Sequence, residues 1–163
     1  MTERYMHDQM SARRFNALER NFAPYQEPVS RFAREKGLEV EKYYHDFPAW
    51  FIGRTQRVED NDVMWWNIQF GYDTKHGRFE LVTSAWMDRE YTTEEGRVRE
   101  RRLVEPAAVI ATWARGHQVD MNAMLEEAYQ RATTYTEQDL NKVSASITGH
   151  DGVTRSYNPG QAA

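Results

Sequence analysis

The feature that most constrains the fold is the alternation of apolar and polar side chains over Val63–Tyr72. The apolar set occupies every second position: Met64, Trp66, Ile68, Phe70 and Tyr72. The intervening positions include Asn67, Gln69 and Gly71. Successive side chains of a strand point to opposite faces of its sheet, so a period of two predicts a strand with one buried face. The chain must therefore build a sheet whose apolar face needs a cover.

Three further segments complete a predicted four-stranded antiparallel β-meander. These segments are 48–57, 78–90 and 97–104, and polar turns separate them. Gly77 and Gly96 stand in two of the turns, where longer hairpin loops favour a residue with positive φ. Apolar pairing sets the register, with Phe70 opposite Leu81 on one face. A shift of one residue would turn every side chain to the other face, so this register is strongly specified.

The segments that flank the meander have helical spacing. We expect helices over about 1–22, 28–36, 107–115 and 121–132, with a short last helix near Thr136. The fold class is therefore α+β, with N-terminal helices, the meander, and C-terminal helices packed on one sheet face. Residues 1–145 form one predicted domain, and the polar, Gly/Pro-bearing segment 146–163 is a predicted C-terminal tail.

The second face of the predicted sheet combines aromatic residues with arginines. The register places Trp65 opposite Trp86, and Phe51 points to the same side. Keeping Glu90 opposite Arg97 in the fourth strand gives two further pairs, Asp88–Arg99 and Trp86–Arg101. The candidate partner-binding residues are Phe51, Trp65, Trp86, Arg99 and Arg101. If the N-terminal helices covered this face instead, the two tryptophans would be ordinary core residues.

The same register creates a conflict in the fourth strand. Glu100 and Arg102 point toward the apolar side, and burying charged groups is costly. Either this strand extends past the helices, or a bulge changes the phase of its side chains. Charged edge strands also resist unwanted sheet extension, which gives the composition a purely structural reason.

Catalytic and metal-binding signals are weak. The chain has no cysteine, which excludes disulfides and thiolate sites. It has no Gly-x-Ser-x-Gly elbow, phosphate-binding loop or dinucleotide fingerprint. Three His-Asp pairs, at His7, His45 and His150, lie in predicted ends or turns rather than on a metal-binding scaffold. We expect no cofactor, no metal and a non-enzymatic role.

Charge and composition narrow the partners and the location. The formal net charge of −4 gives no general attraction to nucleic acid or anionic membranes. No apolar run is long enough to cross a bilayer, and the first residues lack the apolar region of a signal peptide. Together with the absence of cysteine, this predicts a cytoplasmic or other reducing intracellular compartment.

The leading functional hypothesis is a protein-binding or assembly subunit. It would use the aromatic/arginine face and the terminal tails to bind a protein partner or another copy of itself, and such a chain would form an oligomer or a complex. The second hypothesis is a small-molecule pocket, with or without enzymatic activity, between the sheet and the C-terminal helices. Its lining residues would be His45, Trp50, Tyr72 and Trp113. The third is nucleic-acid binding through the strand Arg97–Arg102.

Overall fold

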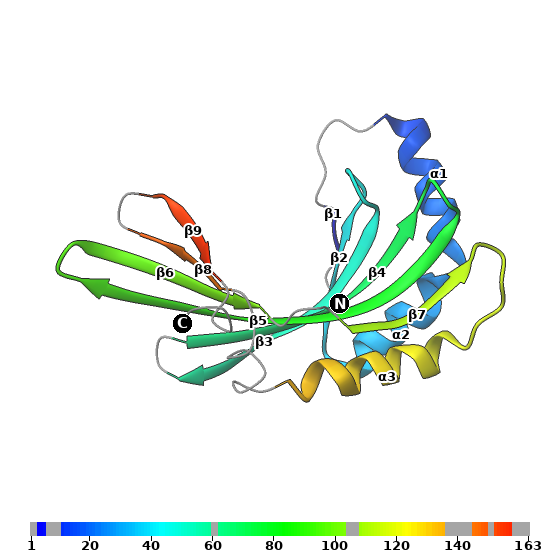
Figure 1. Ribbon diagram of the computed structural model, residues 1–163. Coiled ribbons are helices and arrows are strands. Elements are labelled where there is room, and N and C mark those ends of the chain that lie inside the picture. Colours follow the sequence, from blue (N-terminus) through cyan, green and yellow to red (C-terminus); the bar gives the residue numbers. More distant parts are fainter. Residues whose placement is uncertain are drawn as a thin grey trace.

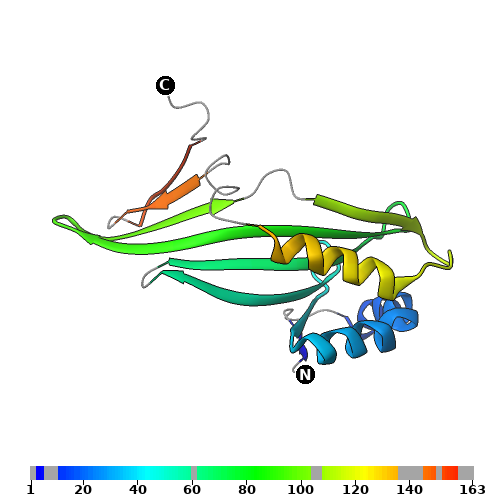
Figure 2. The same cartoon turned by 90° about the horizontal axis from the view of Figure 1, so that it is seen from below.

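The protein is an α+β protein built around a curled antiparallel sheet (Figure 1). The computed structural model describes residues 3–5, 11–59, 62–103, 108–135, 145–149 and 152–157. Figures 1 and 2 show the three α-helices gathered at one end of the molecule, while the β5–β6 hairpin extends away from them at the other end. This division into two ends positions the candidate sites.

The first N-terminal helix begins later than the sequence predicts, and the second begins two residues earlier. Helix α1 spans Ala12–Phe22, and the Ser11 side chain caps it by accepting a hydrogen bond from the Arg14 amide at 3.3 Å. A short 3₁₀ turn, η1 (Ala23–Tyr25), contains Pro24 and leads into α2 (Gln26–Lys36), which ends at Gly37 with a φ of 67°. Strand β1 (Glu3–Tyr5) stands where the first helix was expected and pairs in parallel with β2.

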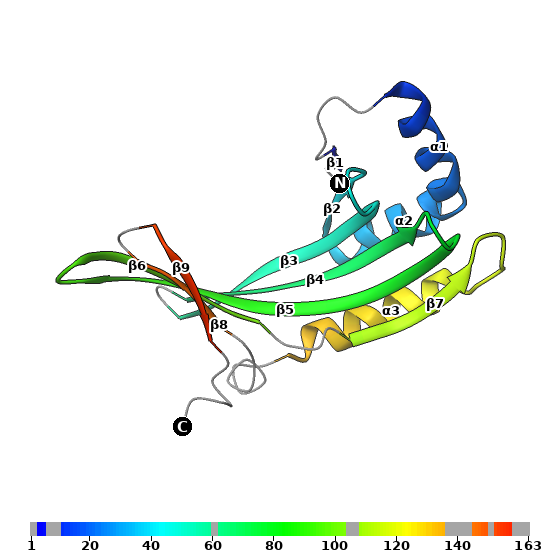
Figure 3. The ribbon, with the colours of Figure 1, turned by 45° about the horizontal axis from the view of Figure 1, so that its top comes forward.

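The predicted meander is present as four consecutive antiparallel strands within a larger sheet (Figure 3). They are β3 (Ala49–Glu59), β4 (Asp62–Asp73), β5 (Arg78–Thr93) and β6 (Gly96–Leu103), and β2 (Glu39–Tyr43) adds a strand beside β3. The register of β3, β4 and β5 is confirmed. Phe70 lies opposite Leu81, and Trp65 lies opposite Trp86.

The prediction of a helix over 107–115 is wrong. Residues Ala108–Ala114 form strand β7, which pairs with the first part of β5, while β6 pairs with the second part of the same edge. Small residues around Val109, Ile110 and Thr112 allowed a helical interpretation, but β-branched side chains favour strands. Pairing with the backbone hydrogen-bonding groups along the β5 edge favours the strand over the helix. The spacing of residues within 107–115 does not show that this edge is present. Helix α3 (Met121–Thr133) follows.

Two short strands lie in the segment around and beyond residue 146, where a polar tail is predicted. Strands β8 (Ala145–Thr148) and β9 (Thr154–Tyr157) form a hairpin, and β8 pairs with the outer edge of β6. Gly152, with a φ of 74°, lies in the connecting turn. The short helix expected near Thr136 lies outside the described residues. The division into a domain over 1–145 and a tail stays a prediction.

Aromatic rings dominate the core between the helices and the sheet. Phe22 of α1 is fully buried, and its ring centre lies 4.9 Å from that of Trp50 and 5.2 Å from that of Phe70. Helix α3 buries Leu125 and Ala128 against the same sheet face. Burying a large apolar side chain contributes about 1.5–3 kcal/mol, so this cluster supplies most of the hydrophobic stabilisation.

A buried lysine lies at the edge of this core. The Lys42 ammonium donates to Gln26 Oε1 at 2.9 Å, lies 3.9 Å from Glu19 Oε1, and stands 4.7 Å above the Trp50 ring. The Trp50 indole N–H donates to the Tyr44 hydroxyl at 2.8 Å, and that hydroxyl donates to Glu19 at 2.6 Å. This network satisfies polar groups that would otherwise be costly to bury.

Candidate functional site

The two central tryptophans lie on the sheet face opposite to the helices. Trp65 of β4 and Trp86 of β5 are direct cross-strand partners, and their rings stack at a centroid distance of 6.3 Å and an interplanar angle of 7°. Both are half-buried, whereas their neighbours Met64 and Trp66 are buried in the helix-covered core. The described helices α1, α2 and α3 therefore cover the other face.

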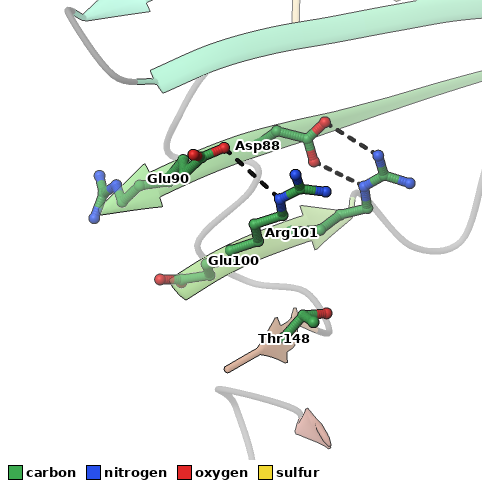
Figure 4. Close-up of a pocket in the computed structure, with 7 residues that line it drawn as sticks. Asp88, Glu90, Glu100, Arg101 and Thr148 are labelled. Atoms are coloured by element: carbon green, nitrogen blue, oxygen red, sulfur yellow. Dashed lines mark hydrogen bonds and ion pairs between the residues drawn. The ribbon is translucent and has the colours of Figure 1, made fainter. Parts of the chain in front are cut away.

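Arg101 joins this tryptophan pair from β6. Its guanidinium lies 5.9 Å from the centre of the Trp86 ring and donates two hydrogen bonds to Asp88, at 2.7 and 3.1 Å. Figure 4 shows this fork between β5 and β6. Because Asp88 accepts these hydrogen bonds, the pKa of the Arg101 guanidinium lies above its usual range. The pair thus holds a planar cation beside the aromatic rings.

The observed pairing of β6 with β5 differs from the predicted register by two residues. Thr93 pairs with Gly96, so only Glu94 and Glu95 form the turn, and Gly96 takes a φ of 132°. The observed cross-strand partners are Glu90–Arg99, Asp88–Arg101 and Trp86–Leu103. A longer loop was expected from the polar run before Gly96. A displacement of two residues preserves the face of every side chain, so the arginines still lie on the tryptophan side.

Carboxylates and guanidinium groups continue along the projecting hairpin. Glu90 forms ion pairs with Arg97 at 2.6 Å and with Arg99 at 3.7 Å. We use "arm" for Trp86–Thr93 of β5 together with β6. The name "Trp/Arg face" denotes Trp65, Trp86, Asp88, Glu90, Arg97, Arg99 and Arg101. A depression of about 410 Å³ lies on the arm, lined by Asp88, Arg89, Glu90, Arg99, Glu100, Arg101 and Thr148.

The charged residues on the other side of the arm resolve the conflict that the sequence raised. Glu100 is only 7% exposed, and its carboxylate accepts a hydrogen bond from Arg102 Nε at 2.6 Å. The two side chains are two residues apart on one strand and therefore share a face. The ionic pair offsets part of the cost of burying the carboxylate, with no bulge recorded in the β5–β6 ladder.

One polar atom at the Trp/Arg face has no partner among the described residues. The indole Nε1 of Trp65 is buried and finds no hydrogen-bond acceptor there, unlike that of Trp50, which donates to Tyr44. A buried donor without an acceptor costs about 1–3 kcal/mol. The tryptophan pair is therefore not an optimised core contact.

Phe51 is separated from the tryptophans along the sheet. It pairs with Gln69, whereas Trp65 pairs with Thr55, so the two positions are four residues apart along β3 and β4. At roughly 3.3 Å per residue the separation is about 13 Å. Phe51 is half-buried and contacts Tyr43 instead, at a ring distance of 6.5 Å. The structure thus brings together Trp65, Trp86 and Arg101, whereas Arg99 lies opposite Glu90, four residues from Trp86 along β5.

Three of the four residues of the predicted pocket belong to the packed core. Trp50, Tyr72 and Trp113 are at most 6% exposed and belong to the core cluster. Trp113 donates its indole N–H to the Tyr25 hydroxyl at 2.9 Å. His45 lies on the surface, where its Nδ1 is 3.1 Å from Asp46 Oδ1. The three aromatic residues are therefore held by packing, and the histidine is separate from them.

Two broader features concern ligands and membranes. Within the described ranges, no three His, Cys, Asp or Glu groups come together in a way that could hold a metal ion. His7 and His150 lie outside those ranges. None of the described helices has the length and apolar character to cross a bilayer.

The sequence did not predict a second hollow, which lies at the helical end. It is formed by the α1–η1 turn and the β7–α3 loop, which are about ninety residues apart in the chain. Gly116 and the N-cap Asp120 signalled a turn, but nothing local indicated what it would face. Comparison of the chain with protein-family models, curated proteins and solved structures finds no match.

Proposed function

We propose that this chain is a non-enzymatic binding or assembly subunit that binds a protein partner through the Trp/Arg face. The observation that carries the proposal is the stacked Trp65–Trp86 pair beside the Asp88–Arg101 fork, on the sheet face that the described helices leave uncovered. Tryptophan and arginine are enriched among the residues that dominate protein–protein binding energies.

The arrangement of the arginine side chains supports pre-organised recognition. Arg101 donates two hydrogen bonds to Asp88, and these hold its guanidinium group beside the Trp86 ring. The arginine therefore loses less conformational entropy when a partner binds. A partner that supplied a carbonyl near the tryptophans would also offer an acceptor to the Trp65 N–H after a small rotation of the ring. The face is therefore suited to a contact in which the aromatic rings form the centre and polar groups surround them.

The charge pattern favours a protein over nucleic acid. Arg97, Arg99 and Arg101 each lie within ion-pair distance of a carboxylate on β5, and Arg102 pairs with Glu100. Phosphate-binding surfaces need cations that are available to replace counterions. We propose a partner with mixed charge, either another protein or a second copy of this chain. Of the terminal segments assigned to the same role, the structure describes residues 3–5, 146–149 and 152–157.

The test is the native mass of Trp65→Ser and Trp86→Ser variants, alone and with the partner. We expect each variant to lose association while keeping its circular dichroism spectrum and a cooperative unfolding transition. The matched control is Val109→Ser, which removes an apolar side chain that is 62% exposed on β7, outside the Trp/Arg face. If both tryptophan variants unfold, or if all three variants associate like the wild type, the proposal fails.

A further inference from the structure

The hollow at the helical end combines an aromatic floor with arginines on its rim. Its volume is about 780 Å³, within the size range of small-molecule sites. Its lining includes Arg20, Asn21, Pro24, Tyr25, Arg115 and Asp120. We call it the Arg20/Arg115 groove. It lies at the opposite end of the molecule from the tip of the arm (Figure 1).

The floor of the groove is apolar and rigidly held. The Tyr25 ring contacts the stacked Phe70 and Phe79 rings in edge-on geometry, at centroid distances of 5.1 and 5.0 Å. Its hydroxyl accepts the Trp113 indole N–H, which fixes the ring orientation. Pro24 lies beside it on the exposed side. An apolar ligand body would therefore contact a preformed surface and would not need to order it.

The rim of the groove is cationic. Arg115 donates to the Asn21 side-chain oxygen at 3.4 Å, and both Arg20 and Arg115 line the groove. Within the part of the chain that the structure describes, neither arginine has a carboxylate partner. Asp120 is the one acid in the lining, and its Oδ1 accepts the Ala123 amide at 3.0 Å as the cap of α3. Two guanidinium groups therefore remain available to an anion.

We propose that the Arg20/Arg115 groove binds a small organic anion. A carboxylate or phosphate group would pair with the two guanidinium groups, and the apolar body would lie on Tyr25 and Pro24. Planar guanidinium groups match the geometry of both anionic groups. The apolar floor distinguishes this ligand class from a simple inorganic ion. The proposal is independent of the Trp/Arg face, because no residue is shared between the two sites.

The test is an NMR titration of the intact chain with matched aromatic probes. The probes are benzoate and phenyl phosphate, with benzyl alcohol and inorganic phosphate as the neutral and non-aromatic counterparts. We expect the two aromatic anions to shift the amide signals of residues 20–28 and 115–121. Both counterparts should bind more weakly by about tenfold or more, because each lacks one half of the recognition.

Arginine variants locate the binding. Arg20→Gln with Arg115→Gln should weaken benzoate and phenyl phosphate by about tenfold or more, since charged hydrogen bonds are lost. The matched control is Arg13→Gln with Arg31→Gln, which removes two exposed helix arginines outside the groove and should leave both affinities unchanged. The rim arginines are exposed, so thermal unfolding should confirm that each double variant is folded.

Four results would overturn the proposal. The first is equal binding of benzyl alcohol and benzoate, and the second is undiminished binding by the Arg20/Arg115 double variant. The third is inorganic phosphate binding as tightly as phenyl phosphate. The fourth is a glutamate-rich hexapeptide shifting the groove signals when neither aromatic anion does, which would assign the groove to an acidic protein segment.

Discussion

The helix-covered end of the molecule and the arm share one strand, β5, and differ in what that strand faces. Over Phe79–Met87 every second side chain of β5 is buried against the helices. The next two positions of the same series are Arg89 and Tyr91, which are half-buried and exposed. The change occurs where the helical layer ends. One continuous strand thus contributes first to the core and then to the surface. The change from apolar residues to Arg89 along the same face shows where the core ends.

The two ends also treat polar groups differently. In the helix-covered end, Lys42 and the Trp50 indole are buried and hydrogen-bonded. On the Trp/Arg face the Trp65 indole N–H has no acceptor, and the ion pairs are largely exposed. Stability is therefore concentrated in the first region, while the second has features that a bound partner would improve. The following predictions test this division.

The largest effect is expected in the aromatic core. Phe22→Ala removes a fully buried ring that contacts Tyr44, Trp50 and Phe70. We expect a loss of about 3–5 kcal/mol in the free energy of unfolding, because the cavity adds to the lost transfer energy. Urea denaturation measures this quantity. A loss below about 1 kcal/mol would show that the ring is not part of a tightly packed core.

The two indole N–H groups provide an internal comparison. Tyr44→Phe removes the acceptor of the buried Trp50 N–H and should cost about 1–3 kcal/mol. Trp65→Phe removes a donor that has no acceptor, so we expect a cost below about 1 kcal/mol despite the smaller ring. Urea denaturation of both variants tests the contrast. Equal costs would contradict the difference between the two regions.

The ion pairs of the arm should matter little for folding. Asp88→Asn breaks the fork with Arg101, whose side chain is 54% exposed. Exposed pairs contribute about 0–1 kcal/mol, so the midpoint of urea unfolding should move only slightly. Association should weaken more strongly, because Arg101 loses its fixed position over Trp86. A large loss of stability without a change in association would assign the pair to the fold alone.

The smallest effect concerns the turn between β4 and β5. Asp73 accepts hydrogen bonds from the Lys75 and His76 amides and lies 2.7 Å from His76 Nδ1, and the contact with His76 lowers the pKa of this carboxyl. His76→Ala should raise that pKa toward its ordinary value of about 4, measured by NMR titration. An unchanged pKa would exclude His76 as the cause.

The sign of the linked stability follows from the lowered pKa. A carboxyl with a depressed folded-state pKa stabilises the fold at pH values above its ordinary pKa, and this contribution is lost as the pH falls through the folded-state pKa. The wild type should therefore be slightly more stable to unfolding than the His76→Ala variant at neutral pH. This difference in stability should shrink below about pH 4.

Much of the sheet could be predicted because alternation encodes both face and register. Trp65, Trp86 and Arg101 fell on one face because a displacement of two residues in β6 leaves the parity unchanged. The turn length could not be read from the polar run before Gly96. There the hydroxyl of Thr93 accepts the Glu95 amide and donates to the Gly96 carbonyl, which closes a two-residue turn.

The remaining elements depend on long-range contacts that local patterns do not contain. Strand β7 was expected to be a helix, yet it completes the edge of β5, and β8 similarly pairs with β6. The burial of Lys42 also depends on Gln26 and Glu19, which the fold brings beside its ammonium group. The Arg20/Arg115 groove likewise joins two segments whose proximity exists only in the folded chain.

The most direct measurement of the central claim is the native mass of the Trp86→Ser variant beside its unfolding midpoint, under conditions where the wild type associates. The account predicts that the variant loses the associated species and keeps a cooperative transition close to that of the wild type. A variant that unfolds, or one that associates as the wild type does, would contradict the claim that the Trp/Arg face serves binding and not folding.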